Sequence, residues 1–187
     1  HDDLNRSTSG SFSRRIVHYK DFTREASPNL WFSDHATDDY GHGTHVAGII
    51  AGAGVKSDGT FTGVAPGASI VALKVLDSRG AGTTSNVLAA LEWVRANHRA
   101  YNIKVVNLSL GHPVYEKAAY DPLVIAVEEL TQQGLVVVTA AGNLGKLKTT
   151  GEIMYGSVTS PGNAPSAITV GAANTQGTLV RGDDVVA

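Results

Sequence analysis

The stretch Tyr40-Gly-His-Gly-Thr-His-Val-Ala-Gly48 carries more information about fold and chemistry than any other part of the chain. Small residues dominate it and continue to position 52, which predicts a helix that packs closely against a neighbour. His42 stands between two glycines, so another molecule could approach its imidazole closely, and an exposed imidazole suits a general base. The stretch alone leaves two alternatives open: a structural histidine, or a metal shared by His42 and His45, although the Glu of the HExxH arrangement is absent.

Several further motifs follow in order along the chain: Gly63-Val-Ala-Pro-Gly-Ala68, Val106-Asn-Leu-Ser-Leu-Gly111, Ala140-Ala-Gly-Asn143, Ser160-Pro-Gly162 and Ile168-Thr-Val-Gly-Ala172. Together with the histidine stretch, this ordered set resembles the subtilisin-like serine proteases (subtilases) over roughly residues 40–173. Several motifs in the right order are far more specific than any one of them. The resemblance implies a serine endopeptidase that acts through an acyl-enzyme.

The resemblance also assigns roles to individual residues. His42 corresponds to the general base and His45 to a structural position, while Asn143 corresponds to the donor that binds the oxyanion of the tetrahedral intermediate. Two segments correspond to the strands that hold the substrate backbone, and a third lines the oxyanion region and the primary pocket. These substrate-binding residues are Gly80, Ala81 and Gly82, then Ser109, Leu110 and Gly111, then Ala140, Ala141 and Gly142.

The primary pocket, which takes the substrate residue on the amino side of the cut, is expected to be apolar. Leu144 follows Asn143 directly and brings no charge, and Leu110, Ala140 and Ala141 add only apolar or small groups. A lysine side chain would lose hydration there without gaining a partner, whereas Phe or Leu would gain about 1.5–3 kcal/mol of burial. The far side of the pocket, around residues 157–160, matches the family only loosely.

Composition limits the classes of function. The 187 residues are 42% hydrophobic and carry a net charge of −2, which fits one soluble domain and gives no reason to expect nucleic acid or an anionic membrane as a partner. No apolar run is long enough to cross a membrane, and the absence of cysteine excludes disulfides and thiol catalysis. No signal peptide is visible; the resemblance implies a secreted protein with polypeptide substrates and an N-terminal propeptide in its precursor.

Hydrophobic periodicity predicts alternating strands and helices. Apolar runs predict strands at Ile70–Leu76, Val105–Leu108 and Leu135–Thr139. One helix is predicted from the spacing of Val87, Leu91 and Val94, with Thr84 or Ser85 as its N-cap. A second helix is predicted from the spacing of Leu123, Val127 and Leu130. Asp121 is its N-cap, Pro122 its first residue and Gly134 its end. Residues 1–15 and 144–160 are expected to be loops. The predicted fold is a three-layer αβα sandwich around a mostly parallel sheet, subtilisin-like and incomplete at both ends.

The incompleteness follows from the family's order of catalytic residues, which is Asp, His, Ser. His1-Asp2-Asp3-Leu4 resembles the His-Pro-Asp-Leu element that comes shortly after the catalytic Asp, and no Gly-Thr-Ser-Met-Ala motif for the nucleophile is present. Residues 1–187 are therefore expected to be a partial subtilase catalytic domain, inactive alone. The alternative is a non-catalytic pseudoprotease that grips peptides through Gly80–Gly82 and Ser109–Gly111.

No cofactor is expected to be required, and no metal site is assigned. Many relatives bind calcium with the Asp that Asp3 matches, but the loop Gly54–Thr60 lacks their Asn-rich run, and Lys56 would repel a cation. Calcium is thus left open with little support. The acidic stretch Asp34, Asp38 and Asp39, with His35, could also bind a cation, although such charge is equally favourable in a solvated loop before a helix N-terminus.

Overall fold

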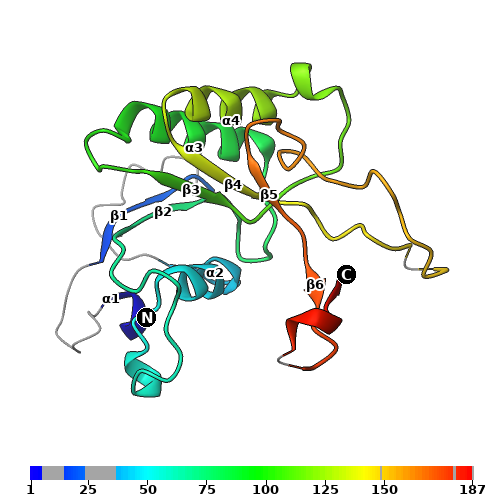
Figure 1. Ribbon diagram of the computed structural model, residues 1–187. Helices are drawn as coiled ribbons and strands as arrows, with labels where there is room; N and C mark the ends of the chain where they lie inside the picture. Colours follow the sequence, from blue (N-terminus) through cyan, green and yellow to red (C-terminus); the bar gives the residue numbers. More distant parts are fainter. Residues whose placement is uncertain (6–14, 24–36, 148, 179, 187) are drawn as a thin grey trace. The chain divides into compact units, whose positions relative to one another are not determined.

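The computed structural model describes residues 1–5, 15–23, 37–147, 149–178 and 180–186 (Figure 1). The chain divides into two units, His1–Ala90 and Leu91–Ala187. Each unit builds its own share of the predicted strands and helices, and the candidate site residues are distributed between them.

Unit 1 contains a parallel pair of strands and the helix that begins at the histidine motif. Its elements are α1 (Asp2–Asn5), β1 (Ile16–Asp21), α2 (His42–Ala51), η1 (Val55–Ser57) and β2 (Ile70–Lys74). β1 pairs with β2 in parallel, from Ile16 opposite Ile70 to Asp21 opposite Lys74. The sequence prediction missed β1 and extended β2 by two residues, because the run Ile70–Leu76 stays apolar past the end of the pairing.

A buried arginine holds several segments of unit 1 together. The Arg15 guanidinium donates hydrogen bonds to the carbonyl oxygens of Ala51 and Pro66, both at 2.7 Å, and to that of Asp3. Its side chain is almost fully buried. A buried guanidinium is costly unless its N–H donors are satisfied, and these three carbonyls satisfy them. In return, the hydrogen bonds from Arg15 hold the end of α2 and the loop before β2 in place.

Unit 2 contains a three-stranded parallel sheet, β3-β4-β5, and a separate antiparallel pair, β6-β7. The helix α3 (Thr84–Asn97) runs from unit 1 into unit 2. The remaining elements are β3 (Val105–Leu108), η2 (Ala118–Tyr120), α4 (Pro122–Gln132), β4 (Val136–Ala140), β5 (Ile168–Val170), β6 (Ala173–Asn174), η3 (Arg181–Asp183) and β7 (Val185–Val186). The mostly parallel pairing agrees with the α/β prediction; among the described residues the strands pair as β1-β2, β3-β4-β5 and β6-β7.

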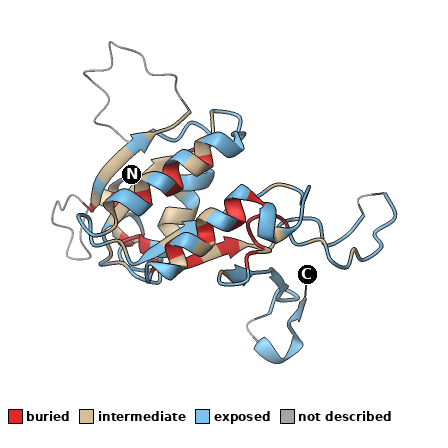
Figure 2. Cartoon of the chain, turned by 90° about the horizontal axis from the view of Figure 1, so that it is seen from above, coloured by how far each residue is buried: buried red, intermediate tan, exposed pale blue. Residues whose placement is uncertain are grey.

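α4 forms as the sequence predicts. The Asp121 side chain accepts the backbone N–H of Leu123, Pro122 occupies the first turn, and Gly134 has a φ of 86° just beyond the helix. The apolar stripe of α4 is buried, and buried residues are red in Figure 2. The helix packs on β4. This stripe forms the centre of the apolar core of unit 2.

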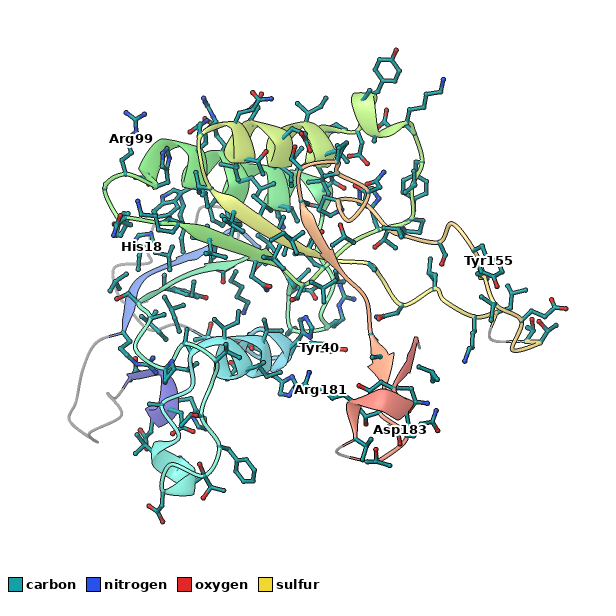
Figure 3. All side chains as sticks on the ribbon, in the orientation of Figure 1. His18, Tyr40, Arg99, Tyr155, Arg181 and Asp183 are labelled. Carbon is teal, nitrogen blue, oxygen red and sulfur yellow. The ribbon has the colours of Figure 1, made fainter. Side chains whose placement is uncertain are left out.

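Two regions expected to be loops contain ordered structure. Residues 2–5 form α1, and the segment after Asn143 folds back on itself, with an antiparallel bridge between Lys146 and Ile153. Figure 3 shows Tyr155 on this excursion, away from the strands of its unit, and its side chain is highly exposed. Among the helices in the described ranges, none has the length and apolar character needed to span a bilayer.

Candidate active site

His42 is the first residue of α2, and its position depends on how that helix begins. Gly41 occupies the N-cap position with a φ of 91°, a backbone conformation that residues other than glycine rarely adopt. The Asp38 carboxylate accepts the N–H of Gly41 at 2.9 Å and the N–H of Thr44 at 2.7 Å. Two of the otherwise unpaired donors at the start of the helix are thereby satisfied, and His42 is held between them in an exposed position.

The same contacts control the ionisation of Asp38. Partial burial works to raise the pKa of its carboxyl group, but the hydrogen bonds from Thr44, Gly41 and Tyr40 outweigh it, and the pKa lies below its ordinary value. Asp38 is therefore a carboxylate across the neutral range. Its negative charge also lies at the positive end of the helix dipole, where it is favourable.

Asp39 has a different partner. Its Oδ2 lies 3.0 Å from the Nζ of Lys74, the last residue of β2. Burial works to lower the pKa of Lys74, but the hydrogen bond and charge of Asp39, with smaller effects of Tyr19 and Asp21, raise it overall. The described members of the predicted acidic stretch thus act as a helix cap and an ion-pair partner, while Asp34 and His35 lie outside the described residues. No cluster of three or more His, Asp or Glu side chains suited to a metal occurs within the described ranges.

The segment Gly80–Gly82 lies next to the histidine stretch within unit 1. A Cβ added at Gly80 would come within 2.7 Å of the Tyr40 ring, so this ring, labelled in Figure 3, lies directly against the glycine. Gly80 closes a turn with a φ of 74°, which differs from the extended conformation expected for it. Asp77 stabilises the turn, because its Oδ1 accepts the N–H groups of Arg79 at 2.9 Å and Ala81 at 3.1 Å.

The other predicted residues come together in unit 2. β3 and β4 are parallel and in register up to Leu108 opposite Thr139, so Ser109–Gly111 and Ala141–Asn143, which follow the two strands, leave the sheet at the same edge. Gly142 has a φ of 100°, and the chain turns there before the exposed Asn143. A side chain just past the carboxyl end of a parallel strand is well placed for a ligand in an open α/β sheet.

A third segment, Val158–Gly162, completes this arrangement and was only loosely anticipated from the sequence. Its Thr159 N–H donates to the Ala141 carbonyl at 3.0 Å, and Ser160 and His112 exchange backbone hydrogen bonds of 3.0 and 2.9 Å. It is thus attached to both predicted pocket walls. Nothing in the sequence signals this adjacency, because the three segments are separated by long stretches of chain.

The structure therefore assembles the predicted residues as two groups. His42 and Gly80–Gly82 belong to unit 1, whereas Ser109–Gly111 and Ala140–Asn143 belong to unit 2. In unit 1 Gly80 contacts Tyr40, two residues before His42, and in unit 2 the two predicted walls follow from the paired strands β3 and β4. The sequence missed the direct contacts of Tyr40 with Gly80 and of Thr159 with the two walls.

The region that corresponds to the relatives' calcium loop is occupied by a lysine and its partners. The Asp3 Oδ1 accepts the N–H of Lys56 at 2.9 Å, and the Lys56 Nζ lies 2.9 Å from the Asp2 Oδ2. Calcium prefers six to eight oxygen ligands, and an ammonium group among these carboxylates opposes a divalent cation. Here Asp3 accepts a backbone N–H and Asp2 pairs with an ammonium group.

Comparisons with known proteins agree with the motifs. The family model described as "Subtilase family" matches residues 1–182. Serine protease AprX of Bacillus subtilis strain 168 is 39% identical over 155 residues, covering 80% of this chain and 34% of that protein. Subtilisin E of the same strain is 42% identical over 137 residues, covering 73% of this chain and 32% of that protein. Among solved structures, Sphericase aligns with a TM-score of 0.71 and 30% identity, covering 100% of this chain and 53% of that chain.

The chain belongs to the subtilase family, and its fold is the α/β fold of the subtilisin-like proteins. It spans about a third of the length of the two Bacillus relatives and about half of Sphericase.

Proposed function

We propose that the complete protein is a serine endopeptidase in which this chain supplies the general base, the oxyanion donor and the walls of the substrate cleft. The observation that carries the proposal is the family match over residues 1–182, which includes both His42 and Asn143 at the positions of the family motifs. The nucleophilic serine and the orienting aspartate are supplied by other parts of the protein.

In this mechanism His42 takes the proton from the serine hydroxyl as it attacks the peptide carbonyl, and then gives it to the leaving amine. The exposed position of His42 at the start of α2 leaves its ring accessible to such a partner. The Asn143 amide donates a hydrogen bond to the oxyanion of the tetrahedral intermediate. Neither residue forms a covalent bond with the substrate.

The substrate backbone adds as a strand beside the two small-residue segments. Ala81 already uses its backbone groups within the turn, because its N–H bonds to the Asp77 carboxylate and its C=O accepts the Asp77 N–H at 2.7 Å. The Gly80 N–H likewise donates to the Asp77 carbonyl at 3.0 Å, so this segment meets the peptide as a closed turn. The substrates are polypeptides without a strong sequence requirement, except in the primary pocket, which is apolar.

The test uses the complete gene product and a chromogenic peptide. We expect His42→Ala to reduce kcat to a residual level of about 10³–10⁴ over water, with peptide binding retained. Asn143→Ala should lower kcat with little change in KM; the loss of about 10²–10³ is carried over from one such donor in a subtilisin rather than derived for this protein. His98→Ala, one residue past the end of α3, is the control and should leave activity unchanged.

Retention of most activity in His42→Ala would contradict the assignment of the base. Peptide binding by the complete protein without any hydrolysis, and without labelling by a fluorophosphonate, would favour the non-catalytic pseudoprotease instead. The 187-residue chain alone should neither hydrolyse peptides nor react with the fluorophosphonate, because no segment of it carries the family's nucleophile motif.

We further propose that the protein is secreted, that its precursor carries an N-terminal propeptide, and that the loop Gly54–Thr60 keeps its conformation without calcium. The contacts of Lys56 with Asp2 and Asp3 support the last point. Isothermal titration of the 187-residue chain with calcium chloride should give no binding heat. Saturable binding that is abolished in Asp3→Asn would contradict it. Appearance of the processed protein in the culture medium tests the first two points.

A further inference from the structure

Each residue of the segment Thr37–Tyr40, which leads into α2 and His42, contacts another part of unit 1. The Tyr19 hydroxyl on β1 lies 3.4 Å from both the carbonyl oxygen and the Oγ1 of Thr37. The next three residues contact the start of α2 (Asp38), Lys74 (Asp39) and Gly80 (Tyr40). The approach of the chain to the candidate base is therefore held from β1, from the end of β2 and from the turn that follows β2.

The hydrogen bonds of Asp38 do not fix α2 relative to the strands of its unit. Both of its partners, Gly41 and Thr44, belong to the cap and the first turn of α2 itself, so the cap and the helix start can move as one piece. The far end of α2 is held by Arg15, which donates to the Ala51 carbonyl. The position of the near end, and with it that of His42, depends on the contacts that reach β1 and β2.

Among these contacts, the pair of Asp39 with Lys74 is charged and joins the segment to a strand. The Lys74 Nζ lies 3.0 Å from the Asp39 Oδ2, and the Lys74 side chain is only 12% exposed, which limits the positions of its ammonium group. A charge-assisted hydrogen bond is roughly twice as strong as a neutral one. β2 is itself paired with β1 along its whole length, up to Lys74 opposite Asp21. The segment is therefore tied to a rigid element three residues before His42.

We propose that Lys74 is a positioning residue of the protease, which through Asp39 sets the place of His42 for proton transfer. This inference rests on the proposed function and adds to it a residue that touches neither the substrate nor the reacting atoms. Proton transfer requires the base within about 2.6–3.2 Å of its partner, and a misplacement of about 1 Å can cost about 10²-fold in rate. Loss of the pair therefore slows the chemical step. Binding of the peptide is retained, because it uses the segments Gly80–Gly82 and Ser109–Gly111.

The test measures kcat and KM of the complete enzyme on a chromogenic peptide, with active sites counted by fluorophosphonate labelling taken to completion. Asp39→Asn and Lys74→Met should each lower kcat, by up to about 10²-fold, with little change in KM. The double variant should fall no further than the lower of the two single variants, because all three remove the same contact. Asp39→Glu should retain most of kcat, because Asp39 is about half exposed and a longer carboxylate can still reach the ammonium group.

Glu92→Gln is the matched control, because it also turns a carboxylate into an amide and breaks an exposed ion pair, with Arg95 on α3, and it should leave kcat unchanged. Rates are expressed per active site, so a variant that folds only in part still reports correctly. The inference is overturned by a wild-type kcat in either single variant, by a loss confined to KM, by single effects that multiply in the double variant, or by an equal loss in Asp39→Glu or Glu92→Gln. Absence of any hydrolysis or fluorophosphonate labelling by the wild type would instead overturn the proposed function.

Discussion

At the scale of single residues, the position of the candidate base depends on Asp38 as much as on the motif that contains His42. The carboxylate of Asp38 bonds to the backbone on both sides of His42, at Gly41 and at Thr44. An acidic residue shortly before a helix can accept hydrogen bonds from its first N–H groups, and its negative charge is favourable at that end of the helix dipole. The sequence alone therefore indicated a favourable charge at this position. The sequence did not show which of the neighbouring aspartates forms the cap and which forms an ion pair.

We predict that Asp38→Ala destabilises the chain by about 1 kcal/mol, the usual cost of losing a capping side chain. The pKa of Asp38 is lowered in the folded state, so its contribution is fully present above the unfolded value of 3.8 and is lost as the pH falls below that value through the folded pKa. Urea unfolding followed by circular dichroism at pH 7 and at pH 3 measures the difference. Asp184→Ala is the control, and an equal effect of Asp38→Ala at both pH values would contradict the assignment.

Resemblance to the family motifs selected His42, Asn143 and the two predicted walls as candidates, but it did not show their spatial neighbours. A residue can be recognised from a motif when its side-chain chemistry and its spacing to other motif residues are unusual. Thr159 has neither property: it is an ordinary threonine in a polar stretch, and its importance comes only from the segments that pack around it. Tyr40 is similar, since its contact with Gly80 depends on a turn closed by Asp77.

At the scale of elements, the prediction succeeded where local signals and packing agree. α4 has a cap, a proline in its first turn, a buried stripe and a terminal glycine, and all of them appear as expected. β1 was missed because only Ile16 and Val17 are aliphatic in Ile16–Asp21, so no apolar run marks the strand. Its stability comes from parallel pairing with the distant β2, which no local pattern reveals.

The ion pair at the end of β2 gives a prediction at this scale. Lys74 is mostly buried, whereas Asp39 is about half exposed. Asp39→Asn leaves a poorly hydrated ammonium without its main partner and should cost about 1–2 kcal/mol of unfolding free energy. Lys74→Met leaves only an exposed carboxylate that water can hydrate, so it should cost less than Asp39→Asn.

The pH dependence checks the same pair. The pKa of Lys74 is raised in the folded state, so the pair stabilises the chain fully below the unfolded value of 10.5 and loses its effect as the pH rises through the folded pKa. The difference between the wild type and Asp39→Asn should therefore shrink in strongly alkaline solution. Chemical denaturation at neutral and alkaline pH measures it, with Glu116→Gln as control. A larger loss in Lys74→Met than in Asp39→Asn would count against this account.

At the scale of the whole molecule, several large apolar side chains of the chain are exposed to solvent. In unit 1, Phe61 is 78% and Val64 is 90% exposed. In unit 2, one face of the β3-β4-β5 sheet is covered, with Val137 and Thr139 buried, while Val105, Val136, Ile168 and Val170 on these strands stay exposed. The sequence could not predict which of these side chains are exposed, because the residue type of an apolar strand position does not depend on whether another element covers it.

We predict that the isolated 187-residue chain self-associates through the exposed face of this sheet. Val105 stands opposite Val136 in the register, so their side chains share one face and form an exposed apolar patch on it. Removing such surface from water yields about 25 cal/mol per Å², which drives association until another layer covers it. Val136→Lys should shift the chain toward the monomer, because a charge in that surface is costly to bury, whereas Val114→Lys, on an exposed loop, should not. Sedimentation velocity over a series of concentrations measures the effect; a monomer at every concentration, or an equal response to both lysines, would show that this face does not drive association.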